Sequence, residues 1–212
     1  MVTKQKVIVI GGGGHAKVII SILKKIKRFN TIGYLDTADK GRILGVKYLG
    51  DDKRLGEIKN RYGRCAAVIG IGTVAISDKR HKIKEKLESL GYALPAVVSP
   101  DAVVNEDVEI GEGAVIHDGA VINSGSCIGV CAIINTGSSV DHDCWIGDFV
   151  HIAPGAVLCG GVRVGDNSLI GAGATVIPYK KICRDSLIGA GAVVINDCDA
   201  PGVYMGIPAK KR

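Results

Sequence analysis

Aliphatic residues recur at every sixth position along the second half of the chain. The series runs from Val98 to Val194, and every member is Val, Ile or Leu. The residue four places after each is small or valine, with the single exception of Lys180. Neither an α-helix, with its period of 3.6, nor a strand, with its period of two, explains this spacing. A hexapeptide β-helix does, because each six-residue unit forms a short strand whose aliphatic side chain points into a triangular prism.

Three such units complete one coil, so residues eighteen apart should stack. The run from residue 98 to residue 199 predicts between five and six coils, in a prism roughly 25–30 Å long at the usual strand spacing. The alternative, an ordinary β-sandwich, would not require one strict period over so many units.

The first half of the chain alternates short apolar runs with longer amphipathic segments. Strands are predicted over residues 6–11, 31–36 and 66–72, and helices over residues 16–28, 51–63 and 77–92. This alternation indicates a parallel sheet built from βαβ units. We therefore expect an α/β Rossmann-like half-domain over residues 1–95 and a β-helix over residues 96–212.

Composition narrows the possible partners. Aromatic residues make up only 4% of the chain, as expected where the core is a narrow prism filled by Ile and Val. The net charge of +6 is modest, and no arginine-rich stripe with interleaved aromatics indicates nucleic acid. A mild positive excess suits a small anionic ligand such as a nucleotide or a coenzyme with phosphates.

The seven cysteines form no CxxC pair and are odd in number, which favours reduced thiols over a disulfide or metal framework. The opening segment passes directly from lysines into a strand and then glycines, without a signal-peptide core, and no apolar stretch reaches membrane length. We expect a cytoplasmic protein with no membrane segment.

A glycine motif follows the first predicted strand and opens the first helix. Gly11, Gly13 and Ala16 fit the dinucleotide fingerprint, and Asp36 lies at the end of the next strand. An NAD-linked enzyme is one interpretation. However, about 95 residues supply only one mononucleotide-binding half. We therefore expect the glycine amides and the helix dipole to hold a nucleotide-sugar diphosphate, with Asp36 accepting hydrogen bonds from a ribose or base.

Several segments together carry a family resemblance. They are the repeats "IGEGAV" and "IGAGAT", the N-terminal "IGGGGHAKV" and "GYLD", the central "NTGSSVDHD…VHIAPGA" and the C-terminal "GIPAKK". In this combination the chain resembles the hexapeptide-repeat sugar O-acyltransferases of the sialic acid O-acetyltransferase type. It is most similar to N-acetyltransferases that act on UDP- or GDP-linked 4-amino-sugars in glycan or polysaccharide biosynthesis. The resemblance implies a left-handed parallel β-helix, acetyl-CoA as co-substrate, no metal, and a homotrimer with active sites between neighbouring prisms.

The resemblance also implies roles for individual residues. His142 corresponds to the general base, with Asp143 beside it, and His151 is placed near the coenzyme A thioester. Further coenzyme contacts fall on Gly160, Ala172 and Ala190. The substrate-binding positions are Gly13, Gly14, His15, Asp36, Thr37, Gly72 and Asn135. The loop after the third strand, "TVAISDKR", is longer than in the family.

Acyl transfer from a thioester needs an amine or alcohol that loses its proton as it attacks. A histidine with a pKa near neutrality is a suitable base, and a neighbouring carboxylate can fix its tautomer. His142 lies between Asp141 and Asp143. Because neighbouring strand residues point to opposite faces, both carboxylates cannot contact the imidazole in a regular strand. Which of them orients His142 is left open by the sequence.

Other interpretations remain for several residues. His117 reads as a surface histidine rather than a ligand. A zinc site is disfavoured because the spacings between His117, His142 and His151 do not match the eighteen-residue stack. Cys144 could be a nucleophile, but a small core filler is the favoured interpretation. Lys180, Lys181, Arg184 and the terminal "AKKR" are candidate phosphate partners, although a solvated role is more usual.

Two alternative functions also stay open at this point. One is O-acetylation of sialic acid or another sugar hydroxyl. The other is a non-catalytic nucleotide-sugar sensor or scaffold.

Overall fold

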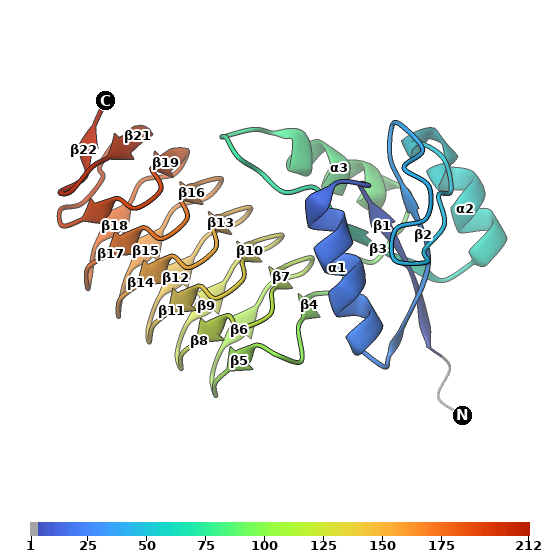
Figure 1. Ribbon diagram of the computed structural model, residues 1–212, viewed down its shortest axis with the longest axis horizontal. Coiled ribbons are helices and arrows are strands. Elements are labelled where there is room, and N and C mark those ends of the chain that lie inside the picture. Colours follow the sequence, from blue (N-terminus) through green and yellow to red (C-terminus); the bar gives the residue numbers. More distant parts are fainter. Residues whose placement is uncertain (1–3) are drawn as a thin grey trace. The chain divides into compact units, whose positions relative to one another are not determined.

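The structure, a computed structural model, describes residues 4–212 (Figure 1). The first three residues of the predicted N-terminal domain lie outside that range. The chain divides into two compact units. The N-terminal unit is the chain up to Gly72 together with Asp78–Pro100, and the C-terminal unit is Asp101–Arg212 together with Thr73–Ser77.

The N-terminal unit contains a three-stranded parallel sheet in the order β2-β1-β3. Its strands are β1 (Gln5–Ile10), β2 (Phe29–Leu35) and β3 (Cys65–Ile69). Its helices are α1 (Gly14–Lys25), the short 3-10 helix η1 (Asp52–Arg54), α2 (Leu55–Tyr62) and α3 (Lys79–Ser89), and β4 (Val97–Val98) follows. Helix α1 packs on β1 and β2 through its buried apolar face. The predicted α/β half-domain with a parallel sheet is therefore confirmed.

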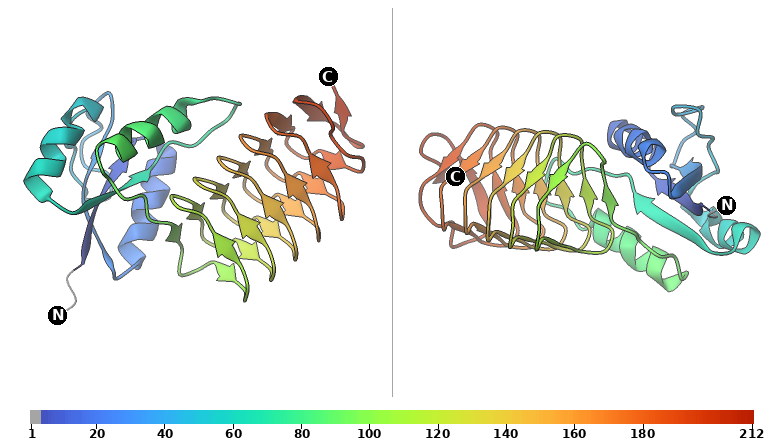
Figure 2. Two further views of the ribbon diagram at one scale, coloured as in Figure 1. Left: turned by 180° about the vertical axis from the view of Figure 1, so that it is seen from behind. Right: turned by 90° about the horizontal axis from the view of Figure 1, so that it is seen from below.

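The C-terminal unit is a left-handed parallel β-helix of short strands on three faces (Figure 2). The first face contains β7 (Val115–Ile116), β10 (Ile133–Ile134), β13 (His151–Ile152), β16 (Leu169–Ile170) and β19 (Ser186–Ile188). The second contains β5 (Val103–Val104), β8 (Val121–Ile122), β11 (Ser139–Val140), β14 (Val157–Leu158), β17 (Thr175–Val176) and β20 (Val193–Val194). The third contains β6 (Glu109–Ile110), β9 (Cys127–Ile128), β12 (Trp145–Ile146), β15 (Arg163–Val164) and β18 (Lys181–Ile182).

The strand registers confirm the predicted stacking. Residues eighteen apart are paired on each of the three faces, for example Ile134 with Ile152 and Ile146 with Val164. The C-terminus continues the first face with β21 (Gly202–Met205), parallel to β19, and β22 (Lys210–Lys211) returns antiparallel to β21.

The interior of the prism is the predicted six-residue series. From Ile116 to Val194 each member is at most 2% exposed, while Val104 and Ile110 near the start of the series are half-buried. Full burial of one aliphatic side chain stabilises a fold by about 1.5–3 kcal/mol. The stacked layers of Ile, Val and Leu thus form a continuous core that holds the turns at the prism edges in place.

Two edges of the prism carry the predicted site residues of this unit, apart from His151 on β13 of the first face. The His142 edge lies between the second and third faces and includes the turns at residues 123–126, 141–144 and 159–162. The Asn135 edge lies between the first and second faces and includes the turns at residues 135–138, 171–174 and 189–192.

Candidate functional site

His142 lies in a turn and not in a strand. β11 ends at Val140 and β12 begins at Trp145, so residues 141–144 form a corner of the prism. Asp143 adopts the left-handed backbone conformation, with φ of 57°. This conformation brings its carboxylate back to its neighbour, and Asp143 Oδ2 lies 2.7 Å from His142 Nδ1. The corner therefore selects Asp143 as the carboxylate that contacts the imidazole, which strand alternation could not decide.

Asp141 has a different partner within the same turn. Its Oδ1 atom accepts a hydrogen bond of 2.8 Å from the backbone amide of His142 and one of 2.8 Å from Asn123 Nδ2. Asp141 thus contacts the backbone of the histidine, whereas Asp143 contacts its ring.

The two carboxylates change the protonation equilibrium of the histidine. The hydrogen bond that His142 donates to Asp143 raises the pKa of His142 above its ordinary value of 6.5, partial burial opposes this, and the charges of Asp141 and Asp143 add to the rise. The pKa of Asp141 is lowered, chiefly by the hydrogen bond from Asn123, so this carboxylate stays ionised. His142 is accordingly a stronger base than free imidazole, with a side chain that is 52% exposed.

Glycines of the adjoining coils leave room for this pair. A Cβ atom on Gly160 would lie 2.5 Å from His142 Nε2, and one on Gly125 would lie 2.7 Å from Asp143 Oδ1. The amide of Gly161 donates a hydrogen bond of 2.9 Å to the carbonyl of His142. Because Gly160 carries no side chain, the imidazole can lie directly against the backbone of the next coil.

A groove of about 290 Å³ adjoins this corner. Its lining residues are Asp143, Gly161, Arg163, Tyr179 and Lys181. Asp143 thus belongs both to the groove and to the histidine pair. Of the predicted phosphate partners, Lys181 lines the groove, whereas Arg184 lies on the edge between the third and first faces.

His151 is buried and hydrogen-bonded through both ring nitrogens. Its side chain is on β13, and the residue is only 7% exposed. Nε2 lies 3.0 Å from Asn135 Nδ2, and Nδ1 lies 3.0 Å from the carbonyl oxygen of Thr73. An amide nitrogen donates and a carbonyl accepts, so these contacts fit a neutral ring with its proton on Nδ1. Thr73 belongs to the longer loop noted in the sequence, and this part of it packs with the β-helix.

The structure brings the predicted residues of the β-helix together in two groups. His142, Asp143 and Gly160 share the His142 edge. Asn135, Ala172 and Ala190 share the Asn135 edge, and His151 is bonded to Asn135 from the adjoining first face. In a triangular prism the first face lies opposite the His142 edge, so one chain does not bring His142 and His151 to the same side.

The N-terminal unit contains a cavity of about 330 Å³ beside the ends of its strands. It is lined by Ile10, Gly11, Leu35, Asp36, Thr37, Asp52, Ile71, Lys79, Lys82, Ile83 and Lys86. Two predicted substrate-binding residues, Asp36 and Thr37, are in this wall. No sequence motif singled out the three lysines. The lysines are three and four residues apart, so they lie on one face of the helix predicted over residues 77–92. That spacing was the signal in the sequence for a group of positive charges on this helix.

Asp36 closes the glycine turn. Its Oδ2 atom accepts a hydrogen bond of 2.6 Å from the amide of Gly12, and its Oδ1 atom accepts from Thr37 Oγ1 and from the amide of Ala38. Burial raises the pKa of this carboxyl, but the hydrogen bonds outweigh burial and lower it overall. Asp36 is therefore ionised and fixed in place at the end of β2.

The remaining predicted substrate positions are at the start of α1. Gly13 precedes the helix as its N-cap, Gly14 is its first residue, and a Cβ atom on either would meet nothing within 4 Å. Gly72 packs on His15, because a Cβ atom at Gly72 would lie 3.3 Å from the Cγ atom of that ring. The space at the two helix-terminal glycines suits an anion held by backbone amides.

The surface interpretation of His117 was wrong. His117 is 1% exposed, and burial lowers its pKa to about 4. His117 directly follows Ile116, which points into the prism. The six-residue repeat predicts which positions point inward, but it does not predict which corner residues are buried by other parts of the chain.

Cys144 is also buried, and burial raises its pKa to about 11, so it remains a protonated thiol at neutral pH. Within the described residues 4–212, no cluster of His, Cys, Asp and Glu side chains is arranged to hold a metal ion.

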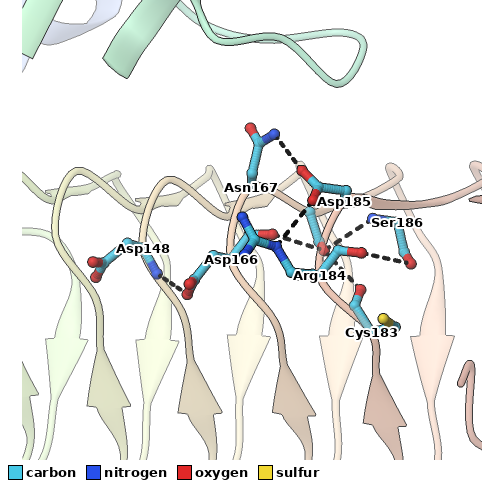
Figure 3. Close-up of polar contacts among 8 residues, drawn as sticks. Asp148, Asp166, Asn167, Cys183, Arg184, Asp185 and Ser186 are labelled. Carbon is cyan, nitrogen blue, oxygen red and sulfur yellow. Dashed lines mark hydrogen bonds and ion pairs between the residues drawn. The ribbon is translucent and has the colours of Figure 1, made fainter. Parts of the chain in front are cut away.

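Arg184 is engaged by its own neighbour. Its Nε atom lies 3.0 Å from Asp185 Oδ2, and Asp185 also accepts a hydrogen bond of 2.7 Å from Asn167 (Figure 3).

Among residues 4–212 no helix has the length and apolar character needed to cross a membrane.

Two family models match the chain. Residues 6–87 match the PglD N-terminal domain, and residues 143–178 match the bacterial transferase hexapeptide model of six repeats. A search among curated proteins gave no match.

Solved structures similar to this chain extend over nearly its whole length. One is a histidine-to-asparagine variant of perosamine N-acetyltransferase from Caulobacter crescentus, solved in complex with CoA and GDP-perosamine. It is 37% identical to this chain with a TM-score of 0.91, and the match covers 99% of this chain and 98% of that one. The acetyltransferase domain of PglB from Neisseria gonorrhoeae, in complex with acetyl coenzyme A, is 33% identical with a TM-score of 0.90, covering 99% and 100%. WeeI from Acinetobacter baumannii is 28% identical with a TM-score of 0.87 and the same coverage. The chain therefore belongs to the hexapeptide-repeat, CoA-dependent sugar N-acetyltransferases that carry a PglD-type N-terminal domain.

Proposed function

We propose that this protein transfers the acetyl group of acetyl-CoA to the amino group of a UDP- or GDP-linked 4-amino-sugar. The observation that carries the proposal is the imidazole–carboxylate pair of His142 and Asp143, 2.7 Å apart on an exposed edge of the prism. The perosamine N-acetyltransferase, similar over almost the full chain, was solved with CoA and a nucleotide-linked sugar, which supports this choice of co-substrate and acceptor.

In the proposed reaction the sugar amine attacks the thioester carbonyl, and neutral His142 accepts the amine proton. A carbon–nitrogen bond forms and the carbon–sulfur bond breaks. The proton held by His142 then passes to the departing thiolate of coenzyme A. Asp143 keeps the imidazole proton on Nδ1 and stabilises the imidazolium that forms. A positioned base of this kind contributes typically about 10²–10⁴-fold to the rate.

The N-terminal unit would bind the nucleotide. In this proposal the amides of Gly13 and Gly14 and the dipole of α1 hold the diphosphate. Asp36 and Thr37, in the wall of the 330 Å³ cavity, would contact the ribose or base. Lys79, Lys82 and Lys86 line the same cavity and would add positive charge beside an anionic ligand.

A homotrimer with shared sites would unite the two groups of residues on the β-helix. One protomer would contribute His142, Asp143 and Gly160, and its neighbour would contribute the Asn135 edge with Asn135, Ala172 and Ala190 and the adjoining His151. The coenzyme would then run between two prisms.

We infer a cytoplasmic location, which agrees with the need for acetyl-CoA and with seven cysteines that form no disulfide within residues 4–212.

An acceptor screen tests the proposal. Thiol release from acetyl-CoA is measured with a panel of UDP- and GDP-linked 4-amino-sugars, and with free sialic acid as the acceptor for O-acetylation. We expect release with an amino-sugar nucleotide and an amide in the product. Release with sialic acid alone would instead establish O-acetylation, and no release with any acceptor would favour a non-catalytic sensor or scaffold.

A further inference from the structure

Three polar side chains stack at the His142 edge with a spacing of eighteen residues. Asn105 Nδ2 donates a hydrogen bond of 2.7 Å to Asn123 Oδ1, and Asn123 Nδ2 donates one of 2.8 Å to Asp141 Oδ1. The same Asp141 oxygen accepts the amide of His142 at 2.8 Å. We call this series, Asn105, Asn123 and Asp141, the edge ladder. It ends on the backbone of the proposed base.

A buried serine holds the two ends of the same turn. Ser126 Oγ donates a hydrogen bond of 2.8 Å to the carbonyl of Asp141, and it accepts one of 3.1 Å from the amide of Cys144. Ser126 is 0% exposed, so solvent does not compete for these bonds. Two residues of the preceding coil therefore fix the turn that carries His142 and Asp143. Asn123 bonds the side chain of Asp141, and Ser126 bonds the backbone at both ends of the turn.

We propose that Asn123 is a positioning residue for the acetyl transfer, because its bond to Asp141 fixes the turn in which Asp143 reaches the His142 imidazole. The inference rests on the proposed function for its catalytic consequence. Asn123 does not contact the ring, and it acts through Asp141. The Asn123 amide is suited to this task because it donates to Asp141 and accepts from Asn105 at the same time.

Asp141 could instead act as a charge that tunes the base. The charged groups that act on the His142 imidazole are Asp141 and Asp143 of its own turn. From the adjoining coils, Gly160 lies against the ring and Gly125 lies against Asp143, so neither position adds a charge. An Asp141→Asn variant separates the two roles, since its Oδ1 atom can still accept from Asn123 and from the His142 amide. A positioning role leaves kcat within about threefold of wild type, whereas a charge role lowers it as far as Asp141→Ala does.

The chain offers a matched control on another edge. Asn167 Nδ2 donates a hydrogen bond of 2.7 Å to Asp185 Oδ1, again eighteen residues on, in a turn without a histidine (Figure 3). Asn123→Leu removes the bond to Asp141, and Asn167→Leu removes the bond to Asp185. Asn167 has a φ of 57°, so Leu there also strains the backbone, which makes an unchanged kcat in that control the more stringent result. We expect Asn123→Leu to lower kcat roughly tenfold or more with little change in KM, because a small misplacement of a catalytic group is costly. Asn167→Leu should leave kcat within about twofold.

A double-mutant cycle joins Asn123→Leu with Asp141→Ala. If both act through one turn, the double variant loses no more activity than the more severe single variant. Full additivity of the two losses, or equal kcat values for Asn123→Leu and Asn167→Leu, would overturn the proposal.

A readout independent of activity completes the test. The imidazole of His142 is titrated by NMR in the full-length protein, with His142→Gln identifying its signal among the five histidines. In Asn123→Leu the pKa of His142 should fall toward 6.5, since the bond to Asp143 raises it, and in Asn167→Leu it should not move. An unchanged pKa in Asn123→Leu would refute the positioning role. If wild type acetylates no acceptor, the proposed function fails, and this titration still decides whether the edge ladder positions His142.

Discussion

His142 and Asp143 are consecutive residues whose side chains form one hydrogen-bonded pair, with Nδ1 and Oδ2 2.7 Å apart. This is possible because Asp143 has a φ of 57° at a corner of the prism. Asn, Asp and Gly tolerate this conformation best among the amino acids. One turn of the repeat therefore supplies both the imidazole and the carboxylate that contacts it.

Replacing Asp143 by Asn should lower activity and shift its pH dependence. Asn keeps the left-handed turn but removes the carboxylate whose hydrogen bond, and to a smaller extent whose charge, raises the pKa of His142. The neutral imidazole, which accepts the proton, predominates above that pKa. The acidic limb of the kcat/KM profile should therefore move to lower pH, while kcat at its plateau falls about tenfold or more because the tautomer is no longer fixed.

The matched control for this variant is Asp185→Asn. Asp185 has a φ of 56° and bonds its preceding neighbour Arg184, as Asp143 bonds His142. Its pH profile should coincide with that of wild type. An unshifted acidic limb in Asp143→Asn would show that this carboxylate does not control the base.

Gly160→Ala should disable the base without unfolding the protein. The added methyl group would lie 2.5 Å from His142 Nε2, and the exposed ring would have to move away from the next coil. We expect a loss in kcat of about ten- to a hundredfold, with the melting temperature almost unchanged. Gly56→Ala is the control, because a Cβ atom there meets nothing within 4 Å. Full activity in Gly160→Ala would place the working imidazole elsewhere.

Co-expressed variants test whether sites are shared between protomers. His142→Ala and His151→Ala should each be inactive alone. In a mixed trimer, one intact His142 faces one intact His151 at one of the three interfaces, so the isolated mixed species should have about a third of wild-type activity. Tandem affinity tags isolate the mixed species, and light scattering gives its mass. A monomer, or mixed trimers as inactive as the parents, would contradict the shared site.

The lysines of the N-terminal cavity should govern nucleotide-sugar affinity. Lys82→Ala removes one charge from the cavity wall, at the cost of an exposed ion pair with Asp78 that contributes little to stability. The Kd for the nucleotide-sugar, measured by calorimetry, should rise several-fold and depend less steeply on salt. Lys47→Ala, outside the cavity, serves as the control. Equal Kd values for the two variants would place the nucleotide elsewhere.

Much of the fold follows from the sequence because its signals are local and repeated. The six-residue series from Val98 to Val194 predicts the coils, and their registers agree at every face described. The helix predicted to reach Arg28 ends at Lys25 instead, since the chain turns into β2 at Phe29. Strand and helix periods locate elements well but their ends poorly.

The site was less accessible because it depends on turn geometry and on burial. Strand alternation could not show that Asp143 bends back to His142, since the reason is a left-handed corner. Likewise, no local pattern indicates that His117 is buried or that Thr73 bonds His151. The edge ladder is visible as an eighteen-residue spacing of Asn105, Asn123 and Asp141, once the coil length is known.

Comparison of His142→Ala with wild type tests directly whether His142 is the general base. Steady-state acetyl transfer is measured with the best amino-sugar nucleotide, and Kd for that nucleotide by calorimetry. We expect a loss in kcat of about 10²–10⁴-fold at nearly unchanged Kd, because the base acts on the proton and not on the nucleotide. An unchanged kcat in His142→Ala would contradict this role of His142.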